Sequence, residues 1–253
     1  MICAFTWGGV THEADLTRPV DLSVTLRNDP SNPTAWYVQP PRFEPVRGEG
    51  FVGAVAEGGS VNFRDVHFNP HGHGTHTECV GHITRDVHPV DPLFRNQPSH
   101  FPCLLVSAQP RHTKGDEVLD LANVPLPDHG ELPPALVVRT LPNDPTKAQR
   151  QWSNTNPPYF VPEFIHHIVR RGVMHLLVDV PSVDREVDGG QLASHHAFWN
   201  VPDNPDNPDL HRSITELVYV PQNVSDGLYL LHLGVAPMHN DAATSRPVLY
   251  PLR

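Results

Sequence analysis

The abundance of proline limits what this chain can fold into. The sequence contains 29 prolines among its 253 residues. A proline lacks the backbone N–H that a helix needs, and its ring clashes with the preceding helical turn. We therefore expect many short extended segments and loops, and few long helices.

Five short apolar runs, rich in β-branched residues, predict buried or half-buried strands. They cover residues 21–26, 103–108, 135–140, 214–220 and 227–235. A further run, VLYPL near the last residue, is a weaker candidate.

The clearest helix is predicted over residues 161–171. Phe164, Ile165 and Ile168 fall on one face of it, and Gly172 ends it. The almost wholly apolar run VMHLLVDV follows at once. Helix, glycine and strand in this order form half of a βαβ unit, which predicts a mixed sheet covered by at least one helix.

The length of the chain and its hydrophobic fraction of 38% suit one globular α/β domain over residues 1–253. Within this domain, residues 200–212 contain few apolar side chains and a short NPD duplication. We expect this segment to be an exposed loop inserted between two ordered elements.

Charge and composition exclude several classes of protein. The formal net charge is −10, and no basic run occurs that could displace counterions from a nucleic acid. The sequence shows neither a secretory signal pattern nor an apolar stretch of about 18 residues, so we expect a cytoplasmic protein without a membrane partner. Its three cysteines are too few and too far apart for a disulfide framework or a zinc pair.

The densest chemical signal lies in NPHGHGTHTECVGHI, residues 69–83, which contains four histidines and one glutamate. In an extended segment, His76 and Glu78 point to the same face, and the glycines allow His71 or His73 to return from a turn. Burying several imidazoles and a carboxylate together is costly without a counter-charge. The segment therefore predicts a metal site, and its mixed nitrogen and oxygen ligands suit zinc, manganese or iron.

A cupin offers a competing interpretation, because His71, His73 and Glu78 also fit the pattern HxHx4E. A cupin would have glycine where this chain has Asp65, and it would carry a second motif that the sequence lacks. The helix and strand predicted after residue 160 also argue against a jelly roll.

The residues GTHTECVGH, from Gly74 to His82, resemble the motif HxGTHxDxPxH of the cyclase family of metal-dependent hydrolases, which includes bacterial kynurenine formamidase and isatin hydrolase. This resemblance places His76 at the second ligand position and Glu78 at the position of the usual aspartate. His82 takes the position of the catalytic histidine, and Val80 replaces the proline.

The first ligand position departs from the family's spacing. One extra residue separates His71 from the GTH sequence, so the strict spacing falls on Gly72. Because glycine has no side chain to offer, the resemblance assigns the position to His71, with His73 as the alternative.

The resemblance continues through VDLSVTL, RGVMHLLVDVPSVD and the C-terminal tail. In LASHHAFW it implies His195 as the next ligand, with His196 beside it, and in SITELVYV it implies Glu216. It also implies a cyclase-like swivelling β/β/α fold, with a mixed sheet or barrel-like core and flanking helices.

The implied cofactor is one or two divalent cations per chain, zinc or manganese, held by His71, His76, Glu78, His195 and Glu216. Such a cation lowers the pKa of bound water from about 15.7 toward roughly 7 and polarises a carbonyl. His82 is then the expected catalytic residue, which moves the proton from the water to the leaving amine.

The implied reaction is hydrolysis of an amide or cyclic amide of a small molecule, as in an arylformamidase. An ester or lactone hydrolase with the same site is one alternative, and a metal-binding protein of this fold without catalysis is another. The resemblance also implies a homodimer or higher homo-oligomer.

Overall fold

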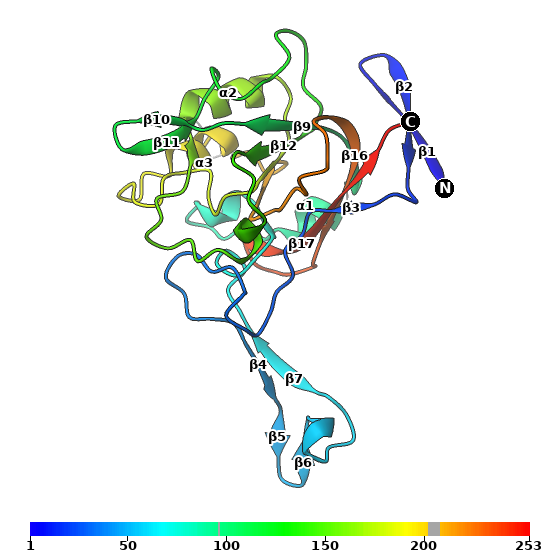
Figure 1. Cartoon of the computed structure of the whole chain (residues 1–253), viewed down its shortest axis with the longest axis vertical. Helices are drawn as coiled ribbons and strands as arrows, with labels where there is room; N and C mark the ends of the chain where they lie inside the picture. Colours follow the sequence, from blue (N-terminus) through cyan, green and yellow to red (C-terminus); the bar gives the residue numbers. More distant parts are fainter. Residues whose placement is uncertain (96, 202–207) are drawn as a thin grey trace.

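A barrel of seven strands forms the centre of the molecule (Figure 1). The computed structural model describes residues 1–95, 97–201 and 208–253. Around the barrel the strands follow the order β16 (Gly227–Val235), β9 (His100–Ala108), β12 (Ala135–Thr140), β14 (His175–Val178), β15 (Ser213–Glu216), β8 (His76–Glu78) and β17 (Ala242–Pro251). Pairing of β16 with β17 closes the ring, and β3 (Val20–Asp21) extends it beside β17. The expected mixed, barrel-like core in a single domain is confirmed.

Both strand directions occur in the barrel. The three neighbouring pairs β9–β12, β12–β14 and β14–β15 are parallel, and every other pair is antiparallel. Helix α2 (Pro162–Arg170) connects β12 to β14, and α3 (Ala193–Trp199) lies between β14 and β15. The βαβ unit predicted from the helix, glycine and strand order is therefore present.

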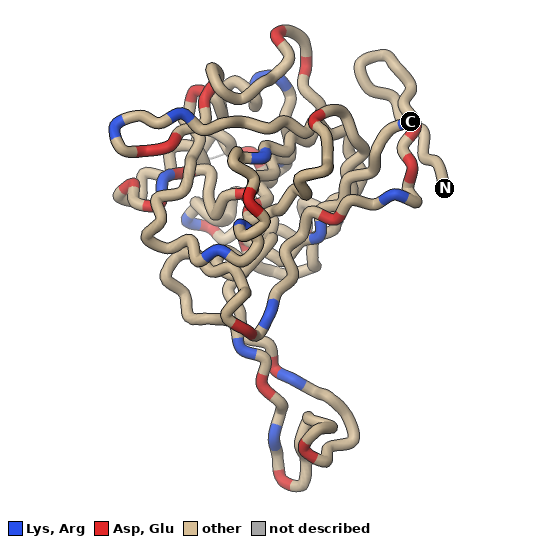
Figure 2. Tube along the Cα trace, in the orientation of Figure 1, with Lys and Arg blue, Asp and Glu red and all other residues tan. Residues whose placement is uncertain are grey.

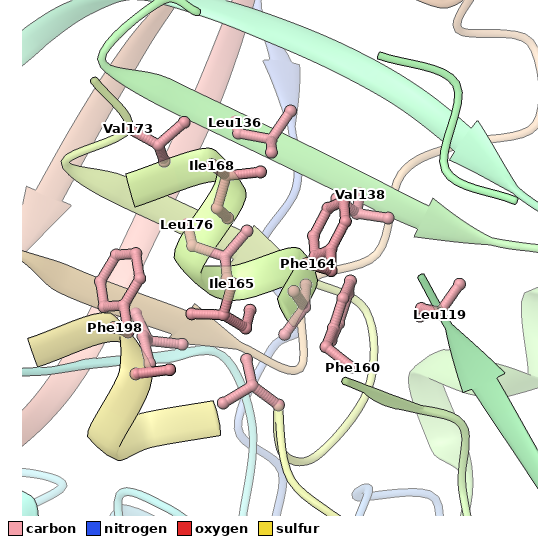
Figure 3. Packing of buried hydrophobic residues seen from close by; sticks show 14 of the residues in the cluster. Leu119, Leu136, Val138, Phe160, Phe164, Ile165, Ile168, Val173, Leu176 and Phe198 are labelled. Atoms are coloured by element: carbon pink, nitrogen blue, oxygen red, sulfur yellow. The ribbon is translucent and has the colours of Figure 1, made fainter. Parts of the chain in front are cut away.

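Strand β12 shows why the barrel strands are apolar throughout. Its alternate side chains belong to two different buried clusters, with Leu136 and Val138 in one and Ala135 and Val137 in the other. The first cluster packs the strands against α2, which contributes Phe164, Ile165 and Ile168 (Figure 3). A strand buried on both faces has no position for a solvated side chain.

Two predicted strands are shorter than expected. The run 214–220 stops pairing at Glu216 because Leu217 adopts a left-handed backbone with φ of 54°. In the run 21–26 only the first residue belongs to β3. The N–H of Leu22 still donates to the carbonyl of Pro247 in β17, but the N–H groups of Ser23 and Val24 donate to the side chains of Asp21 and Thr75.

The remaining elements lie outside the barrel. One short α-helix, α1 (Asp91–Arg95), is accompanied by three 3-10 helices: η1 (Val55–Glu57), η2 (Val80–His82) and η3 (Pro145–Gln149). The small sheets consist of β1 (Ile2–Trp7) with β2 (Val10–Asp15), β4 (Arg42–Pro45) with β7 (Arg64–His67), β5 (Arg47–Gly48) with β6 (Phe51–Val52), and β10 (Arg111–Thr113) with β11 (Asp116–Leu119) and β13 (Tyr159–Phe160). In Figure 1, the segment from β4 to β7 projects far from the barrel as an arm.

Two further expectations concern the surface. Lys and Arg residues are scattered along the trace, the arm included (Figure 2). Among the described residues, the helices are too short or too polar to cross a membrane. Of the predicted loop 200–212, residues 202–207 lie outside the described residues.

Candidate metal centre

The structure brings together all six predicted site residues, although they come from five separate segments. Strand β8 provides His76 and Glu78, and the loop before it provides His71. The other three side chains come from later elements: His82 from η2, His195 from α3 and Glu216 from β15.

Strand β8 lies between β15 and β17, and its register with β15 places His76 opposite Glu216. His76 pairs with Glu216 across the strands, and Nε2 of His76 lies 3.4 Å from Oε2 of Glu216. Because side chains two apart in a strand point to the same face, Glu78 joins His76 on that face. Both carboxylates are almost completely buried, as is His76.

Glu78 lies at the centre of the cluster. Its Oε2 lies 3.0 Å from Nδ1 of His71 and 3.9 Å from Nε2 of His82, and its Oε1 lies 3.0 Å from Nε2 of His195. Three imidazoles from three segments thus converge on one carboxylate.

The geometry favours His71 over His73 as the first ligand. Both ring nitrogens of His73 are occupied elsewhere, because Nδ1 accepts from the backbone of Asn69 at 2.8 Å and Nε2 faces the carbonyl of Gln39 at 2.8 Å. His71 faces Glu78 instead. The tight turn between the two histidines requires Gly72, since a Cβ there would lie 2.7 Å from a methyl group of Val38.

The geometry also favours His195 over His196 as a ligand. Nε2 of His195 points at Glu78, and its Nδ1 lies 2.6 Å from Oδ2 of Asp184. Asp184 also accepts from the backbone N–H groups of Ser194 and His195, which fixes the first turn of α3. Among the described side chains, His196 makes no hydrogen bond or ion pair with the cluster, and its buried Nδ1 is unpartnered.

Two carboxylates that the sequence analysis missed complete the surroundings. Asp184 anchors His195, and Asp241 lies between His71 and His82, 3.0 Å from Nε2 of the first and 3.2 Å from Nδ1 of the second. Asp184 lies within the segment RGVMHLLVDVPSVD and Asp241 within the tail, but neither follows a spacing rule that would single it out.

The cluster concentrates negative charge that the chain does not neutralise. Among the described residues, no Lys or Arg forms an ion pair with Glu78, Glu216 or Asp241. Burial and the neighbouring Glu78 raise the pKa of Glu216. Burial would also raise the pKa of Glu78, but the imidazoles of His82, His195 and His71 hold it well below its ordinary value.

The imidazoles respond in the opposite direction. Burial would lower the pKa of His71, but the carboxylates of Asp241 and Glu78 raise it to about 10. The pKa of His195 lies well above its ordinary value, because Asp184 and Glu78 outweigh its burial. The carboxylates keep protons on the buried imidazoles because they need positive charge nearby. A divalent cation would supply that charge in place of the protons.

Orphaned atoms point to the same conclusion. His76 Nε2 and Glu78 Oε2 are buried and have no hydrogen bond within the normal geometric limits. Three sets of ligand atoms lie within 4.8 Å of one another: His71 with His76 and Glu78, His71 with His82 and Asp241, and Glu78 with His82 and His195. The nitrogen and oxygen donors therefore fit a divalent metal centre.

A cavity of about 300 Å³ opens onto the cluster. Its lining includes His71, His82, His195 and Glu216 from the cluster, together with Trp36. Trp199 and Phe63 do not line this cavity, because Trp199 is buried in the core and Phe63 is exposed on the arm.

Comparisons with known proteins give a matching family and similar folds. The family model described as "Putative cyclase" matches residues 20–185. No curated protein matches the chain in sequence. A solved structure of a predicted metal-dependent hydrolase from Bacillus stearothermophilus is 13% identical over 92% of this chain and 98% of its own, with a TM-score of 0.61.

Two isatin hydrolases have a similar fold. One, bound to the product analogue thioisatinate, is 13% identical over 93% of this chain and 92% of its own, with a TM-score of 0.61. The other, isatin hydrolase A from Labrenzia aggregata bound to benzyl benzoate, is 15% identical over 92% of this chain and 93% of its own, with a TM-score of 0.58.

Proposed function

The chain belongs to the cyclase family, and from this premise we propose that it is a metal-dependent hydrolase that cleaves an amide or cyclic amide of a small molecule. The observation that carries the proposal is the position of Glu78, a buried carboxylate on which His71, His82 and His195 converge from three segments. Such a cluster lacks a packing rationale but offers the donors of a catalytic metal centre.

The proposed ligands are the side chains that face the centre of the cluster: His71, His76, Glu78, His195 and Glu216. These donors exceed what one tetrahedral cation requires, so one or two cations per chain fit the site. Bound there, a divalent cation supplies an acidified water and a polarised carbonyl. Zinc and manganese are the proposed metals because both accept mixed imidazole and carboxylate ligands.

His82 is the proposed catalytic residue. Its Nε2 is directed at Glu78, at 3.9 Å, and its side chain lines the cavity and remains partly exposed. An imidazole in this place can accept a proton from the attacking water and donate it to the nitrogen of the leaving amine. The amide C–N bond then breaks, and the products are a carboxylic acid and an amine.

The shape of the cavity supports a small planar substrate. Its volume of about 300 Å³ suits one or two fused rings, and Trp36 offers an aromatic face for stacking. Formylkynurenine and isatin are the amides to test first, because they are substrates within the family and isatin hydrolases share this fold. A lactone hydrolase is the second candidate, since the same site can attack an ester carbonyl.

Metal content tests the proposal most directly. We expect elemental analysis to find zinc or manganese in the purified protein and little of either in His76→Ala, because His76 is buried in the cluster. His112→Ala, an exposed histidine on β10, serves as the matched control and should keep its metal. Absence of metal from the parent protein, even after reconstitution with manganese or zinc, would overturn the proposal.

The same samples test the reaction. We expect the metal-loaded parent to hydrolyse at least one compound of a panel of formylkynurenine, isatin and small lactones, and His76→Ala to hydrolyse none. Turnover of lactones alone would favour the second candidate. Bound metal without turnover of any compound in the panel would favour a metal-binding protein without catalysis.

We also propose that the protein works in the cytoplasm as a homodimer or higher homo-oligomer. The arm supports an assembly, because Phe51, Phe63 and Val66 are exposed on it and an isolated two-stranded hairpin is only marginally stable in water. Sedimentation of the purified protein should give at least twice the mass of one chain, and a monomer at all concentrations would contradict the assembly.

A further inference from the structure

Asp241 occupies an unusual position at the edge of the metal cluster. Its Oδ2 atom alone contacts two imidazoles, Nε2 of His71 at 3.0 Å and Nδ1 of His82 at 3.2 Å. The two rings are stacked with their centroids 4.3 Å apart. One carboxylate oxygen thus fixes two histidines that lie eleven positions apart and that the proposed function uses in different ways.

The backbone around Asp241 is hydrogen-bonded to the segment that directly follows Glu78. Its carbonyl accepts from the N–H of Cys79, the residue after Glu78, at 3.0 Å, and Asn240 accepts from the N–H of Val90 at 2.8 Å. Asp241 directly precedes β17, which pairs with β8. The carboxylate is therefore held at a constant distance from the strand that carries His76 and Glu78.

An ionised carboxylate can only accept hydrogen bonds, so the nitrogen that faces it must carry the hydrogen. One oxygen of Asp241 has a ring nitrogen of each histidine within hydrogen-bonding distance, and a carboxyl group is ordinarily ionised at neutral pH. His82 therefore carries its hydrogen on Nδ1. In the neutral ring this leaves Nε2, the atom directed at Glu78, as the free base.

We propose that Asp241 is a positioning residue that holds His82 in the Nδ1–H tautomer, with Nε2 directed at the reaction space, and that orients His71 toward the metal. This inference rests on the proposed function only for the role of His82 in catalysis. In the proton transfer, Nε2 of His82 takes the proton from water and returns it to the leaving nitrogen, while Asp241 stays ionised and keeps its hydrogen bond to Nδ1–H.

The tautomer can be measured without any substrate. Nitrogen–proton correlation spectra of the zinc-loaded, ¹⁵N-labelled protein distinguish a ring protonated at Nδ1 from one protonated at Nε2, and the His82→Gln spectrum assigns the signals of His82. We expect Nδ1–H in the parent and a shift toward Nε2–H in Asp241→Ala. Asp29→Asn, an exposed aspartate bound to Ser31, is the control and should leave the spectrum unchanged.

Two further variants separate positioning from folding. Asp241→Asn keeps an acceptor oxygen of the same length, so we expect it to retain the Nδ1–H tautomer in part and to lose less kcat than Asp241→Ala. We expect the alanine variant to bind metal to the same final stoichiometry, with a kcat lowered by about 10²–10⁴-fold and little change in KM.

Two results would overturn the inference. One is an Nε2–H tautomer of His82 in the parent protein, and the other is Nδ1 of His82 coordinated to zinc, which would make His82 a ligand and leave no hydrogen on Nδ1 for Asp241. If instead no compound of the panel is hydrolysed, the proposed function fails while the tautomer result stands on its own.

Discussion

Nε2 of His195 lies 3.0 Å from Oε1 of Glu78, although 117 positions separate the two residues in the sequence. His195 belongs to α3 and Glu78 to β8, and both are almost completely buried. The polar atoms of the pair cannot turn to solvent, so the contact requires α3 to stay packed on the barrel. The arrangement of the cluster is therefore a property of the folded chain and not of either segment.

Replacement of His195 should remove metal, whereas replacement of its neighbour should not. We expect His195→Ala to weaken metal binding by more than the roughly 10–100-fold that loss of an outer hydrogen-bond partner costs. His196→Ala is the matched control, because His196 lies on the same helix without contacting Glu78. Equal metal affinities of the two variants, measured by titration calorimetry, would contradict this assignment.

Asp184 should influence the metal through His195. Asp184→Asn keeps an acceptor for the backbone of Ser194 but removes the charge beside Nδ1 of His195, so we expect metal affinity to fall by roughly 10–100-fold. Asp188→Asn is the control, since Asp188 accepts from Gly190 and Leu192 in the same loop. Affinity that falls equally in both variants would indicate a general loosening of the loop.

His82→Ala should separate catalysis from metal binding. We expect metal content to stay at the parent level and turnover to fall by about 10²–10⁴-fold, the usual contribution of a general acid–base group. His239→Ala, an exposed histidine in the tail, should leave both quantities unchanged. Unchanged turnover in His82→Ala would remove this residue from the mechanism.

His175 should make the fold sensitive to acid. Burial lowers its pKa to about 4, whereas an unfolded histidine titrates near 6.5. Above pH 6.5 the ring is neutral in both states and has no effect on the pH dependence. Between pH 6.5 and 4 only the unfolded chain takes up the proton, so stability falls by about 1.4 kcal/mol per pH unit as the pH decreases, and it levels off below pH 4.

The variant His175→Gln isolates this effect, because glutamine can still bond to Ser213 but does not titrate. We expect the parent to be more stable at pH 7 and the difference to shrink as the pH falls to 4, in urea unfolding of the metal-free protein. A constant difference over this range would show that His175 titrates in the folded state as it does in the unfolded chain.

Lys147 and Asp179 form a buried ion pair, and replacement of one partner alone should destabilise the fold. Nζ of Lys147 lies 3.0 Å from Oδ2 of Asp179 and 2.7 Å from Oγ1 of Thr140. We expect Lys147→Met to cost about 3–5 kcal/mol of unfolding free energy, because it leaves a buried carboxylate without its partner. The double variant Lys147→Met/Asp179→Leu should recover most of this loss, and a double variant no better than the single one would refute the explanation.

Local patterns in the sequence were sufficient for several features. The helix around Phe164 and the strand after Gly172 follow from apolar periodicity, which is a property of neighbouring residues. The shared face of His76 and Glu78 follows from the alternation of a strand in the same way. The ends of the strands were less predictable. The strand that contains Glu216 ends because Leu217 adopts a positive φ, a conformation usually taken by glycine, and no glycine lies nearby in the sequence.

Partners supplied by distant segments could be found only in the folded chain. The sequence left His71 and His73 as alternatives, and the carbonyl of Gln39 decides between them by occupying His73. Asp184 and Asp241 escaped notice because each acts on a histidine through a hydrogen bond, at a separation along the chain that no spacing rule specifies. The sequence by itself determined which donors the chain carries and which of them share a strand, since those depend on composition and backbone geometry. Which nitrogen of each histidine faces the centre was decided by the tertiary structure alone, because only closure of the barrel brings the opposing carboxylates within hydrogen-bonding distance.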